Sequence, residues 1–333
     1  MSTIKSRGIT ALAGIAIAAI ALTGCASGSA PAEQQSAPET TAEFPRTVTD
    51  MAGNEVTIES ADSVAITDNR FFQLAADWDL PITVAPLDLF SPNNPLHDST
   101  EILNIGTHGE PDFEQVVAAD PDVIINGYRF GGDTAQGMKD AAPDAAFIDM
   151  TGPEGQSVEE YVTQSVTLLG EIFDKQADAA AIVEEFHTAI DDAKAAYDPA
   201  VTVMGLVTTG KDINYSNPTD GRGASIFFDL VGLTPALESD GSTSHTGDDI
   251  SLEAIAGSNA DFFLVLDRAA AVASEGGEDQ AALELIKSSA SLASVPAVVN
   301  NAIYVMPADY YLTEDVFAYT KVLNGLTTSF KAL

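Results

Sequence analysis

The sequence predicts an α/β protein whose two lobes are joined by one long α-helix, and three observations predict it. Short apolar runs alternate with helical patterns along the body of the chain, as in α/β units built on largely parallel sheets. A helical pattern of roughly 20 residues, about 30 Å at 1.5 Å per residue, separates two sets of these runs. One segment of the first half also recurs in the second half.

Residues 1–24 have the composition of an export signal. Lys5 and Arg7 precede an apolar run over residues 9–22, and basic residues before a short apolar stretch are typical of secretory signals. The run is shorter than the roughly 20 residues of a membrane-spanning helix. It ends in the letters LTGC, which resemble the lipobox of bacterial lipoproteins. We therefore expect a lipid anchor on Cys25, at the extracytoplasmic face of the cell membrane; the alternative is an ordinary signal peptide with a chance cysteine.

Residues 25–43 are rich in Ala, Ser, Gly, Pro, Glu, Gln and Thr, and they predict a flexible tether because they have too little apolar surface to fold. About 290 residues remain, which is enough for two lobes with sizeable cores. The chain has 14 basic and 50 acidic residues, of which the signal contains two basic and no acidic ones, so the mature net charge is −38. This charge argues against nucleic acid as a partner.

The body of the chain divides into two sets of predicted strands around the helical region. The first set is Val64–Thr67, Thr83–Leu87, Val123–Asn126 and Ala145–Asp149; the second is Val201–Thr208, Phe262–Leu266 and Ile303–Met306. Between them, Ser157 and Glu160 form a capping box, and apolar residues then follow the 3.6-residue period of a helix, the last stretch covering about 175–197. We place the N-terminal lobe at 44–170, the linking helix at 171–198 and the C-terminal lobe at 199–333.

An internal repeat supports the two lobes. Residues 111–129 align without a gap to residues 250–268, and the identical pairs are Glu114 with Glu253, Asp122 with Asp261, and Arg129 with Arg268. Each copy predicts a short helix, a turn and a buried strand, with an arginine just past the strand. Chance similarity of two αβ units is the alternative, and the shared Glu and Arg argue against it.

The repeated arginines predict an anion-binding site. In open α/β sheets, ligands bind beyond the carboxyl ends of the strands, and Arg129 and Arg268 occupy this position, one in each lobe. A guanidinium group donates several fixed hydrogen bonds to anionic oxygens. The mature chain has only five arginines, so we expect these two to converge on one cleft; structural salt bridges are the alternative. Arg70, which follows the first strand, is a further candidate.

Five segments, in a shared order over residues 44–333, resemble one family. They are FPRTVTDMAGNEVTI, EPDFEQVVAADPDVII, TTGKDINYSNPTDGRGASIFFDLVGL, HTGDDISLEAIAGSNADFFLVLDRAAA and MPADYYLTEDV. The chain resembles the ferric-siderophore substrate-binding lipoproteins of ABC importers, in particular the catecholate-binding branch. The resemblance implies a monomeric binding protein without enzymatic activity or intrinsic cofactor, with two lobes on a helical backbone. It would carry an Fe(III)-siderophore to an ABC permease dimer.

The resemblance also implies roles for individual residues. The arginines would form a cationic triangle around an anionic ferric catecholate, namely Arg129, Arg222 and Arg268. His245 and Tyr311 would complete the iron's coordination when the siderophore leaves two positions open. His245 departs from the family's H-G pattern by one residue, and Tyr310 lies beside Tyr311, so a loop histidine and a core tyrosine remain the alternatives.

The matched glutamates Glu114 and Glu253 suggest a second contact. In the family, one acidic residue on each lobe docks against arginines of the permease. A matched pair presents one charge per lobe to a two-fold partner. The alternative is that both are solvated residues on helix faces.

Other functions compete with this interpretation. An importer subunit for Zn or Mn typically needs several imidazoles and carboxylates, whereas the chain has four histidines; haem and cobalamin remain open. A surface hydrolase is the candidate from another class, but the sequence contains no G-x-S-x-G, H-E-x-x-H or Gly-Lys-Ser/Thr motif. A passive adhesion lipoprotein is the third possibility.

Overall fold

The computed structural model describes residues 44–239, 241–272 and 281–333. The predicted signal peptide at 1–24, Cys25 and the predicted tether at 25–43 lie outside the described residues. The chain from Thr41 to Leu333 forms one compact unit. In the described part of the chain, no helix is both long enough and apolar enough to cross a membrane.

The first lobe is built on a five-stranded sheet in the order β5-β4-β3-β6-β7, with all neighbours parallel. Its strands are β3 (Val64–Ile66), β4 (Ile82–Ala85), β5 (Leu103–Asn104), β6 (Val123–Asn126) and β7 (Ala146–Asp149). A hairpin of β1 (Arg46–Thr49) and β2 (Glu55–Ile58) precedes the sheet. The helices are α1 (Phe72–Asp77), α2 (Phe113–Ala119) and α3 (Asp133–Ala141), with the short 3₁₀ helices η1 (Asn69–Phe71), η2 (Leu87–Leu89) and η3 (Tyr128–Phe130).

Both faces of this sheet are covered, which explains its uninterrupted apolar strands. Side chains alternate between the faces of a strand. In β6, Val123 and Ile125 join the large core cluster that continues into the second lobe, whereas Ile124 joins a separate cluster with Val116 of α2. A strand with two buried faces reads as a continuous apolar run rather than an alternating one.

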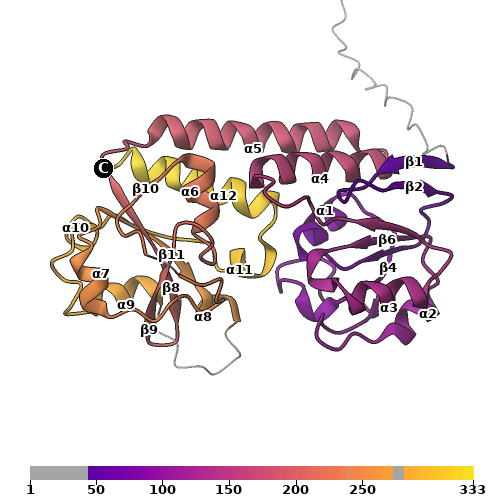
Figure 1. Cartoon of the computed structure of the whole chain (residues 1–333), viewed down its shortest axis with the longest axis horizontal. Coiled ribbons are helices and arrows are strands. Elements are labelled where there is room, and N and C mark those ends of the chain that lie inside the picture. Colours follow the sequence, from indigo (N-terminus) through magenta and orange to yellow (C-terminus); the bar gives the residue numbers. More distant parts are fainter. Residues whose placement is uncertain (1–43, 240, 273–280) are drawn as a thin grey trace, which may run out of the picture. The chain divides into compact units, whose positions relative to one another are not determined.

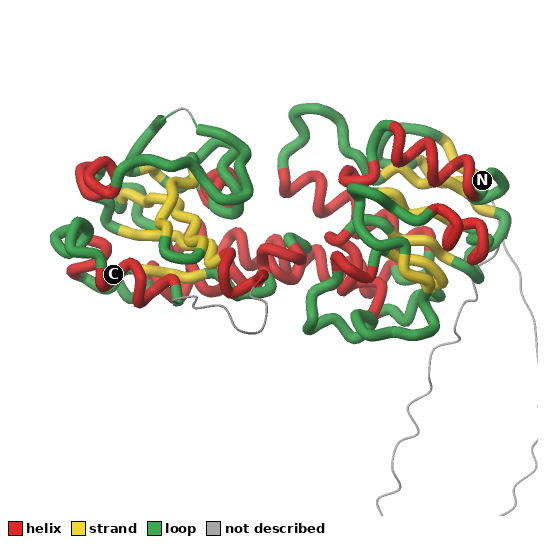
Figure 2. The backbone as a smooth tube through the Cα atoms, turned by 90° about the horizontal axis from the view of Figure 1, so that it is seen from below, coloured by secondary structure: helices red, strands yellow, loops and turns green. Residues whose placement is uncertain are grey.

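The second lobe has a sheet in the order β10-β8-β11-β12, with parallel neighbours, and β9 pairs with β8 in an antiparallel hairpin. Its strands are β8 (Thr202–Thr209), β9 (Asp212–Ser216), β10 (Thr234–Pro235), β11 (Phe262–Asp267) and β12 (Ile303–Val305). The helices are α6 (Ser225–Val231), α7 (Leu252–Gly257), α8 (Arg268–Val272), α9 (Ala282–Ser288), α10 (Pro296–Val299), α11 (Tyr310–Thr313) and α12 (Val316–Phe330). Figure 2 shows the two sheets as separate groups of strands.

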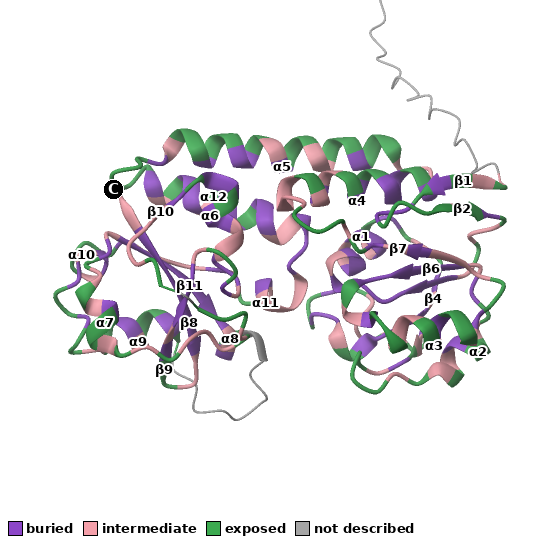
Figure 3. Ribbon diagram, in the orientation of Figure 1, coloured by how far each residue is buried: buried purple, intermediate pink, exposed green. Residues whose placement is uncertain are grey.

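Two helices run between the sheets, α4 (Val158–Ile172) and α5 (Gln176–Ala196), and α5 packs against both α4 and α12 (Figure 1). The predicted capping box of Ser157 and Glu160 is present at the start of α4. Phe186 of α5 is fully buried, while the outer face of α5 is exposed (Figure 3). The predicted fold class is therefore confirmed: two α/β lobes joined by a long helix.

The internal repeat is present as two matching units, α2 with β6 and α7 with β11. The shared aspartates have the same structural role in both lobes. Asp122 Oδ2 accepts hydrogen bonds from the backbone N–H of Asp62 and Ser63, and Asp261 Oδ2 accepts one from the N–H of Thr202. Each carboxylate thus ties the repeated strand to the start of its neighbouring strand, β3 or β8.

All seven predicted strands are present, with ends that differ by up to two residues. The segment FPRTVTDMAGNEVTI, which resembles the first hairpin of the family, forms β1 and β2, and the prediction missed β5, β9 and β10. Two of these contain only two residues, Leu103–Asn104 and Thr234–Pro235, and Asp212–Ser216 is largely polar. None of the three has the apolar run on which the prediction depended.

Candidate ligand-binding site

The arginine candidates follow the carboxyl ends of strands in both sheets. Arg70 in η1 and Arg129 in η3 follow β3 and β6, which are direct neighbours. Arg268 begins α8 immediately after β11. Parallel strands end at the same edge of a sheet, so the side chains that follow them gather there.

Arg70 is held in place by a carboxylate and two aromatic rings. Its Nε and Nη2 donate to Asp68 Oδ1 and Oδ2, at 2.9 and 2.5 Å. Its Cζ lies 4.6 Å from the ring centre of Tyr128 and 4.4 Å from that of Tyr161, within cation–π range. Burial lowers the pKa of Arg70, but the Asp68 carboxylate outweighs this and leaves the pKa above its usual value. The group is therefore a fixed cation.

A glycine permits this arrangement. Gly127 directly follows β6 and precedes η3, and its N–H donates to Thr67 Oγ1 at 2.9 Å. A Cβ at this position would lie 2.5 Å from the Cβ of Asp68, closer than two carbon atoms can approach. The two neighbouring strand ends therefore meet because residue 127 has no side chain.

Two of the predicted arginines converge on a buried carboxylate that sequence reasoning missed. Arg222 Nη2 lies 2.7 Å from Glu314 Oε2, and Arg129 Nη2 lies 3.9 Å from the same oxygen. The Glu314 side chain is only 9% exposed. Burial raises the pKa of Glu314, while Arg222, Arg129 and Arg70 act in the opposite direction and only partly offset it.

Tyr311 joins the third arginine to this cluster. Arg268 Nε donates to Tyr311 Oη at 3.2 Å. The Tyr311 ring centre lies 5.1 Å from Arg222 Cζ and 5.4 Å from Arg268 Cζ. Glu314 thus connects Arg129 with Arg222, and Tyr311 connects Arg222 with Arg268. The structure brings the three arginines of the predicted triangle together.

Two buried hydrogen-bond donors of the cluster have no partner in the part of the chain that the structure describes. The Nε atoms of Arg129 and Arg222 are buried and have no partner within the described residues. Buried donors normally have a partner, because an unmade hydrogen bond in the interior costs about 1–3 kcal/mol. Two unused guanidinium donors at one place are typical of a site that receives an anion.

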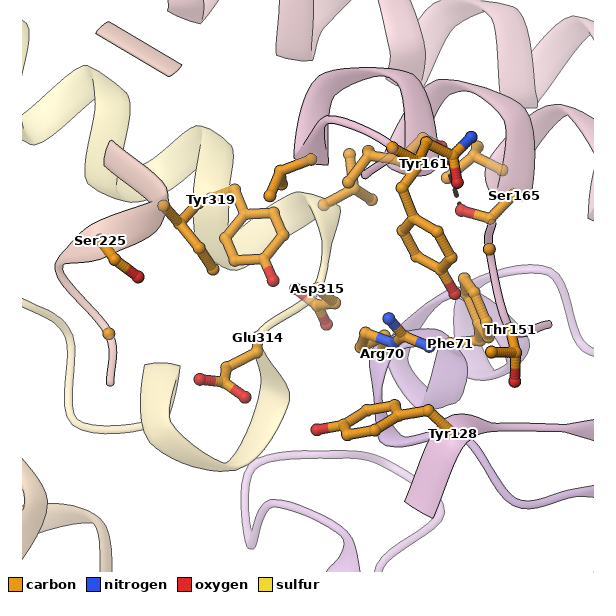
Figure 4. A pocket seen from close by; sticks show the side chains of 18 of the residues that line it. Arg70, Phe71, Tyr128, Thr151, Tyr161, Ser165, Ser225, Glu314, Asp315 and Tyr319 are labelled. Atoms are coloured by element: carbon orange, nitrogen blue, oxygen red, sulfur yellow. Dashed lines mark hydrogen bonds between the residues drawn. The ribbon is translucent and has the colours of Figure 1, made fainter. Parts of the chain in front are cut away.

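A cavity of about 380 Å³ lies beside the cluster, with a polar and an apolar side. Arg70, Arg222 and Glu314 line the polar side, and residues of α4 line the apolar side, namely Val158, Val162 and Val166. Figure 4 shows Tyr161 and Tyr319 facing each other across the cavity, with Tyr128 beside Arg70. Burial raises the pKa of Tyr161 and of Tyr319, so both side chains are neutral where they line the cavity.

The two candidate iron ligands occupy different environments. Tyr311 is half-buried among the arginines, whereas its neighbour Tyr310 is fully buried and its Oη donates to the carbonyl of Gly223 at 3.1 Å. His245 is exposed in a turn beside β9. Asn214 of β9 holds this turn, because its Nδ2 donates to the carbonyl of Thr246 at 2.7 Å. His245 does not line the cavity. Within the described residues, no group of three or more His, Cys, Asp or Glu side chains is placed to hold a metal ion.

Glu114 and Glu253 lie in the first turns of α2 and α7, and both are exposed. Asp112 and Ser251 cap the two helices. Figure 1 shows α2 and α7 each on the side of its own lobe away from α5. The matched pair therefore presents two solvent-facing carboxylates at equivalent places.

Sequence reasoning did not find Glu314, Tyr128, Tyr161 or Tyr319. A signal existed only for Tyr128, which directly precedes Arg129. Glu314 is one of 50 acidic residues, and nothing in its neighbourhood distinguishes it from a surface residue. Tyr161 occupied an apolar position of a predicted helix, which is normally a core position.

The family model of the periplasmic binding proteins matches residues 64–310, most of the chain. The chain belongs to the periplasmic binding protein family. This periplasmic binding protein is 27% identical over 213 residues to the petrobactin-binding protein YclQ of Bacillus subtilis (strain 168), and the alignment covers 63% of each chain, less than two thirds of YclQ. It is 26% identical over 254 residues to the ferric-anguibactin-binding protein FatB of Vibrio anguillarum (strain ATCC 68554 / 775), covering 75% of this chain and 76% of FatB.

Solved structures of the family share the fold. The siderophore binding protein BauB, solved with a complex of two acinetobactin molecules and ferric iron, is similar with a TM-score of 0.71 and 19% identity, over 87% of this chain and 100% of BauB. The structure of YclQ gives a TM-score of 0.69 and 20% identity, over 87% of this chain and 99% of YclQ. This periplasmic binding protein thus shares the fold of both solved structures over 87% of its chain.

Proposed function

We propose that the protein captures a ferric siderophore of catecholate type outside the cytoplasmic membrane and delivers it to an ABC permease for iron uptake. The observation that carries the proposal is the cluster of Arg70, Arg129, Arg222 and Arg268 in a chain whose formal net charge is −36. The protein binds this ligand and does not transform it. The ligand-binding roles of the individual residues are part of the proposal.

The chemistry of the site suits an anionic complex with flat rings. Catecholate oxygens around Fe(III) carry net negative charge, and planar guanidinium groups donate to such oxygens in pairs. The Arg129 and Arg222 side chains are 24% and 21% exposed. Their Nε atoms are buried and have no partner within the described residues, so a rotation of either side chain would bring a further donor to the ligand. The rings of Tyr128, Tyr161 and Tyr319 line the adjoining cavity, and aromatic pairs gain about 0.5–1.5 kcal/mol beyond the area they bury.

Tyr311 is our first candidate for a direct iron ligand, because its hydroxyl already lies in the arginine cluster. His245 is the second candidate and has less support. Its turn lies outside the cavity, so its imidazole would reach the iron only after a movement of this loop. Variants Tyr311→Phe and His245→Ala separate the two roles by their effects on the visible spectrum of a bound tetradentate ferric catecholate.

The names of the relatives support iron as the cargo. YclQ is named as petrobactin-binding, FatB as ferric-anguibactin-binding, and BauB was solved with ferric iron and acinetobactin. The catecholate preference, the lipid anchor on Cys25, the monomeric state and the absence of an intrinsic cofactor go beyond these names and belong to the proposal.

Titration tests the ligand class. The protein beginning after Cys25 is titrated with a ferric catecholate, a ferric hydroxamate and haemin, while Tyr and Trp fluorescence is followed. We expect saturable quenching by the catecholate and much weaker binding of the other two. Absence of saturable quenching by the catecholate, or tighter binding of haemin, would contradict the proposal.

Arginine substitutions test the site. The variant Arg129→Gln, Arg268→Gln should weaken catecholate binding by at least a hundredfold, because each lost charge-assisted contact contributes about 1.5–3 kcal/mol. Arg46→Gln is the matched control: Arg46 pairs with Asp174 near the end of α4, away from the cluster. Equal affinities of the double variant and the control would refute the assigned site.

Charge reversal tests the permease contact. We expect Glu114→Lys, Glu253→Lys to abolish ABC-dependent iron uptake in cells and to leave ligand affinity unchanged, because both carboxylates are exposed and remote from the arginines. Glu184→Lys is the control, since it is also exposed but lies on α5. Normal uptake by the double variant would remove the docking role.

A further inference from the structure

We infer that Glu314 is a built-in counter-anion of the arginine cluster and that it determines which ligand charge the site accepts. The inference rests on the proposed function, because it concerns which ferric complexes the same site prefers. Glu314 would thus contribute to selectivity for the charge of the ferric complex, although neither the internal repeat nor the spacing of motifs indicated this residue.

Glu314 already occupies the position that an incoming anion would take. Its Oε2 is 2.7 Å from Arg222 Nη2 and 3.9 Å from Arg129 Nη2. The side chain is 9% exposed. It lines the cavity together with Arg222, and Figure 4 shows it on the same cavity as Arg70. An anionic ligand that binds these guanidinium groups must therefore compete with the carboxylate or bind beside it.

Local structure does not require a glutamate at this position. Glu314 ends α11 in the left-handed region, with φ +43°. Asparagine and glycine adopt this conformation more readily than glutamate does. Burial of a carboxylate also opposes folding unless it is paired. Neither the backbone conformation nor the burial of this position favours a glutamate. Its contacts with Arg222 and Arg129 are the feature that explains why a glutamate is present.

The charges of the cluster can be counted from the contacts. Four arginines contribute four positive charges, and two carboxylates in direct contact reduce them: Asp68 pairs with Arg70, and Glu314 pairs with Arg222. The cluster therefore has a net charge of about +2, and removal of Glu314 would make it about +3. Two further carboxylates line the cavity, and neither is counted because neither forms an ion pair with an arginine among the described residues: Asp315 accepts a hydrogen bond from the N–H of Ala318 at the start of α12, and Asp220 is exposed.

Ferric complexes differ in charge in a way that this count can distinguish. Fe(III) with three catecholate dianions carries −3, and Fe(III) with two carries −1. Glu314 repels the first complex more strongly than the second, because Coulomb energy scales with the product of the charges. Glu314 therefore weakens the electrostatic preference of the +2 cluster for the more negative complex, and Glu314→Gln should strengthen this preference.

The test compares the affinities of two probes, a synthetic hexadentate ferric tris-catecholate and a synthetic tetradentate ferric bis-catecholate. Glu314→Gln preserves the size of the side chain and removes its charge. We expect the ratio of the two affinities to shift toward the tris-catecholate by at least tenfold, and to shift less at high salt, where charges are screened. Asp220→Asn is the matched control. It also removes one carboxylate from the lining of this cavity, but Asp220 is exposed to solvent whereas Glu314 is buried.

A second variant keeps the test decisive if Glu314→Gln folds poorly. Glu314→Asn also removes the charge, and asparagine tolerates the positive φ of this position. An unchanged ratio in both variants, or a shift no larger than that of Asp220→Asn, would overturn the inference while leaving the proposed function intact. Failure of the wild-type protein to bind either ferric catecholate would instead overturn the proposed function itself.

Discussion

The ion pair of Arg222 and Glu314 makes a quantitative prediction about stability. Arg222→Gln removes the nearest cation from a buried carboxylate whose side chain is 9% exposed. Loss of one partner of a buried pair typically costs 3–5 kcal/mol, because the other charge is left uncompensated. Two features reduce this figure here: Arg222 is itself 21% exposed, and Arg129 remains 3.9 Å from the carboxylate. We therefore expect a loss of about 2 kcal/mol in the free energy of unfolding.

A double-mutant cycle isolates the pair from the other effects of each substitution. Glu314→Gln alone should change the free energy of unfolding by less than about 1 kcal/mol, because it removes both an attraction and a buried charge. Arg222→Gln in the Glu314→Gln background should then cost almost nothing. Urea unfolding of the four proteins at pH 7.5 should yield a coupling energy of about 2 kcal/mol.

The pH dependence of the Arg222→Gln penalty follows from the pKa of Glu314, which burial raises. The loss of Arg222 raises this pKa further in the folded state. A folded carboxyl with a raised pKa retains its proton after the unfolded chain has lost it, so stability falls as the pH rises through this interval. The Arg222→Gln penalty should therefore be largest at neutral pH and shrink toward pH 5.

An ion pair with a less buried carboxylate provides the control for this cycle. Arg46 and Asp174 are 2.9 Å apart, and the Asp174 side chain is 23% exposed whereas that of Glu314 is 9% exposed. Ion pairs contribute less as their charges become more exposed, down to about 0–1 kcal/mol at the surface. Arg46→Gln with Asp174→Asn should thus give a smaller coupling energy. A coupling below about 0.5 kcal/mol for Arg222 and Glu314, or a penalty equal at pH 5 and 7.5, would refute the reasoning.

Three further predictions concern the folded scaffold. Burial raises the pKa of Asp315 from 3.8 to about 7, and ionising this side chain in the folded protein therefore costs at most about 4 kcal/mol of stability. Asp315→Asn retains an acceptor for the cap of α12, so the stability of this variant relative to wild type should rise between pH 4 and pH 8. A difference in urea unfolding that stays constant over this range would contradict the prediction. Gly127→Ala should destabilise the fold by about 1–3 kcal/mol and lower the melting temperature, because the new Cβ would lie 2.5 Å from the Cβ of Asp68. An unchanged melting temperature would show that the ends of β3 and β6 can separate without cost. Phe186→Ala should cost about 3–5 kcal/mol in urea unfolding, since this side chain of α5 is fully buried, and a loss below 1 kcal/mol would mean that α5 is not part of the common core.

The sequence by itself determined the architecture and half of the site. Apolar runs and 3.6-residue periodicity are local properties, so they located seven strands and the helix Gln176–Ala196 without any knowledge of packing. The repeat then indicated two similar lobes. Ligands bind beyond the carboxyl ends of the strands in open α/β sheets. Arg129 and Arg268 directly follow one strand in each lobe, and this predicted that they converge on one cleft between the lobes.

Only the tertiary structure decided which other residues surround these arginines. Glu314 lies far from Arg129 and Arg222 in the sequence, and a carboxylate among 50 has no local mark that distinguishes a buried partner from a solvated residue. The same holds for the choice between Tyr310 and Tyr311, since adjacent residues of a short helix point in different directions. Contacts between distant segments depend on how the lobes pack, and this information is spread over the whole chain rather than contained in any one motif.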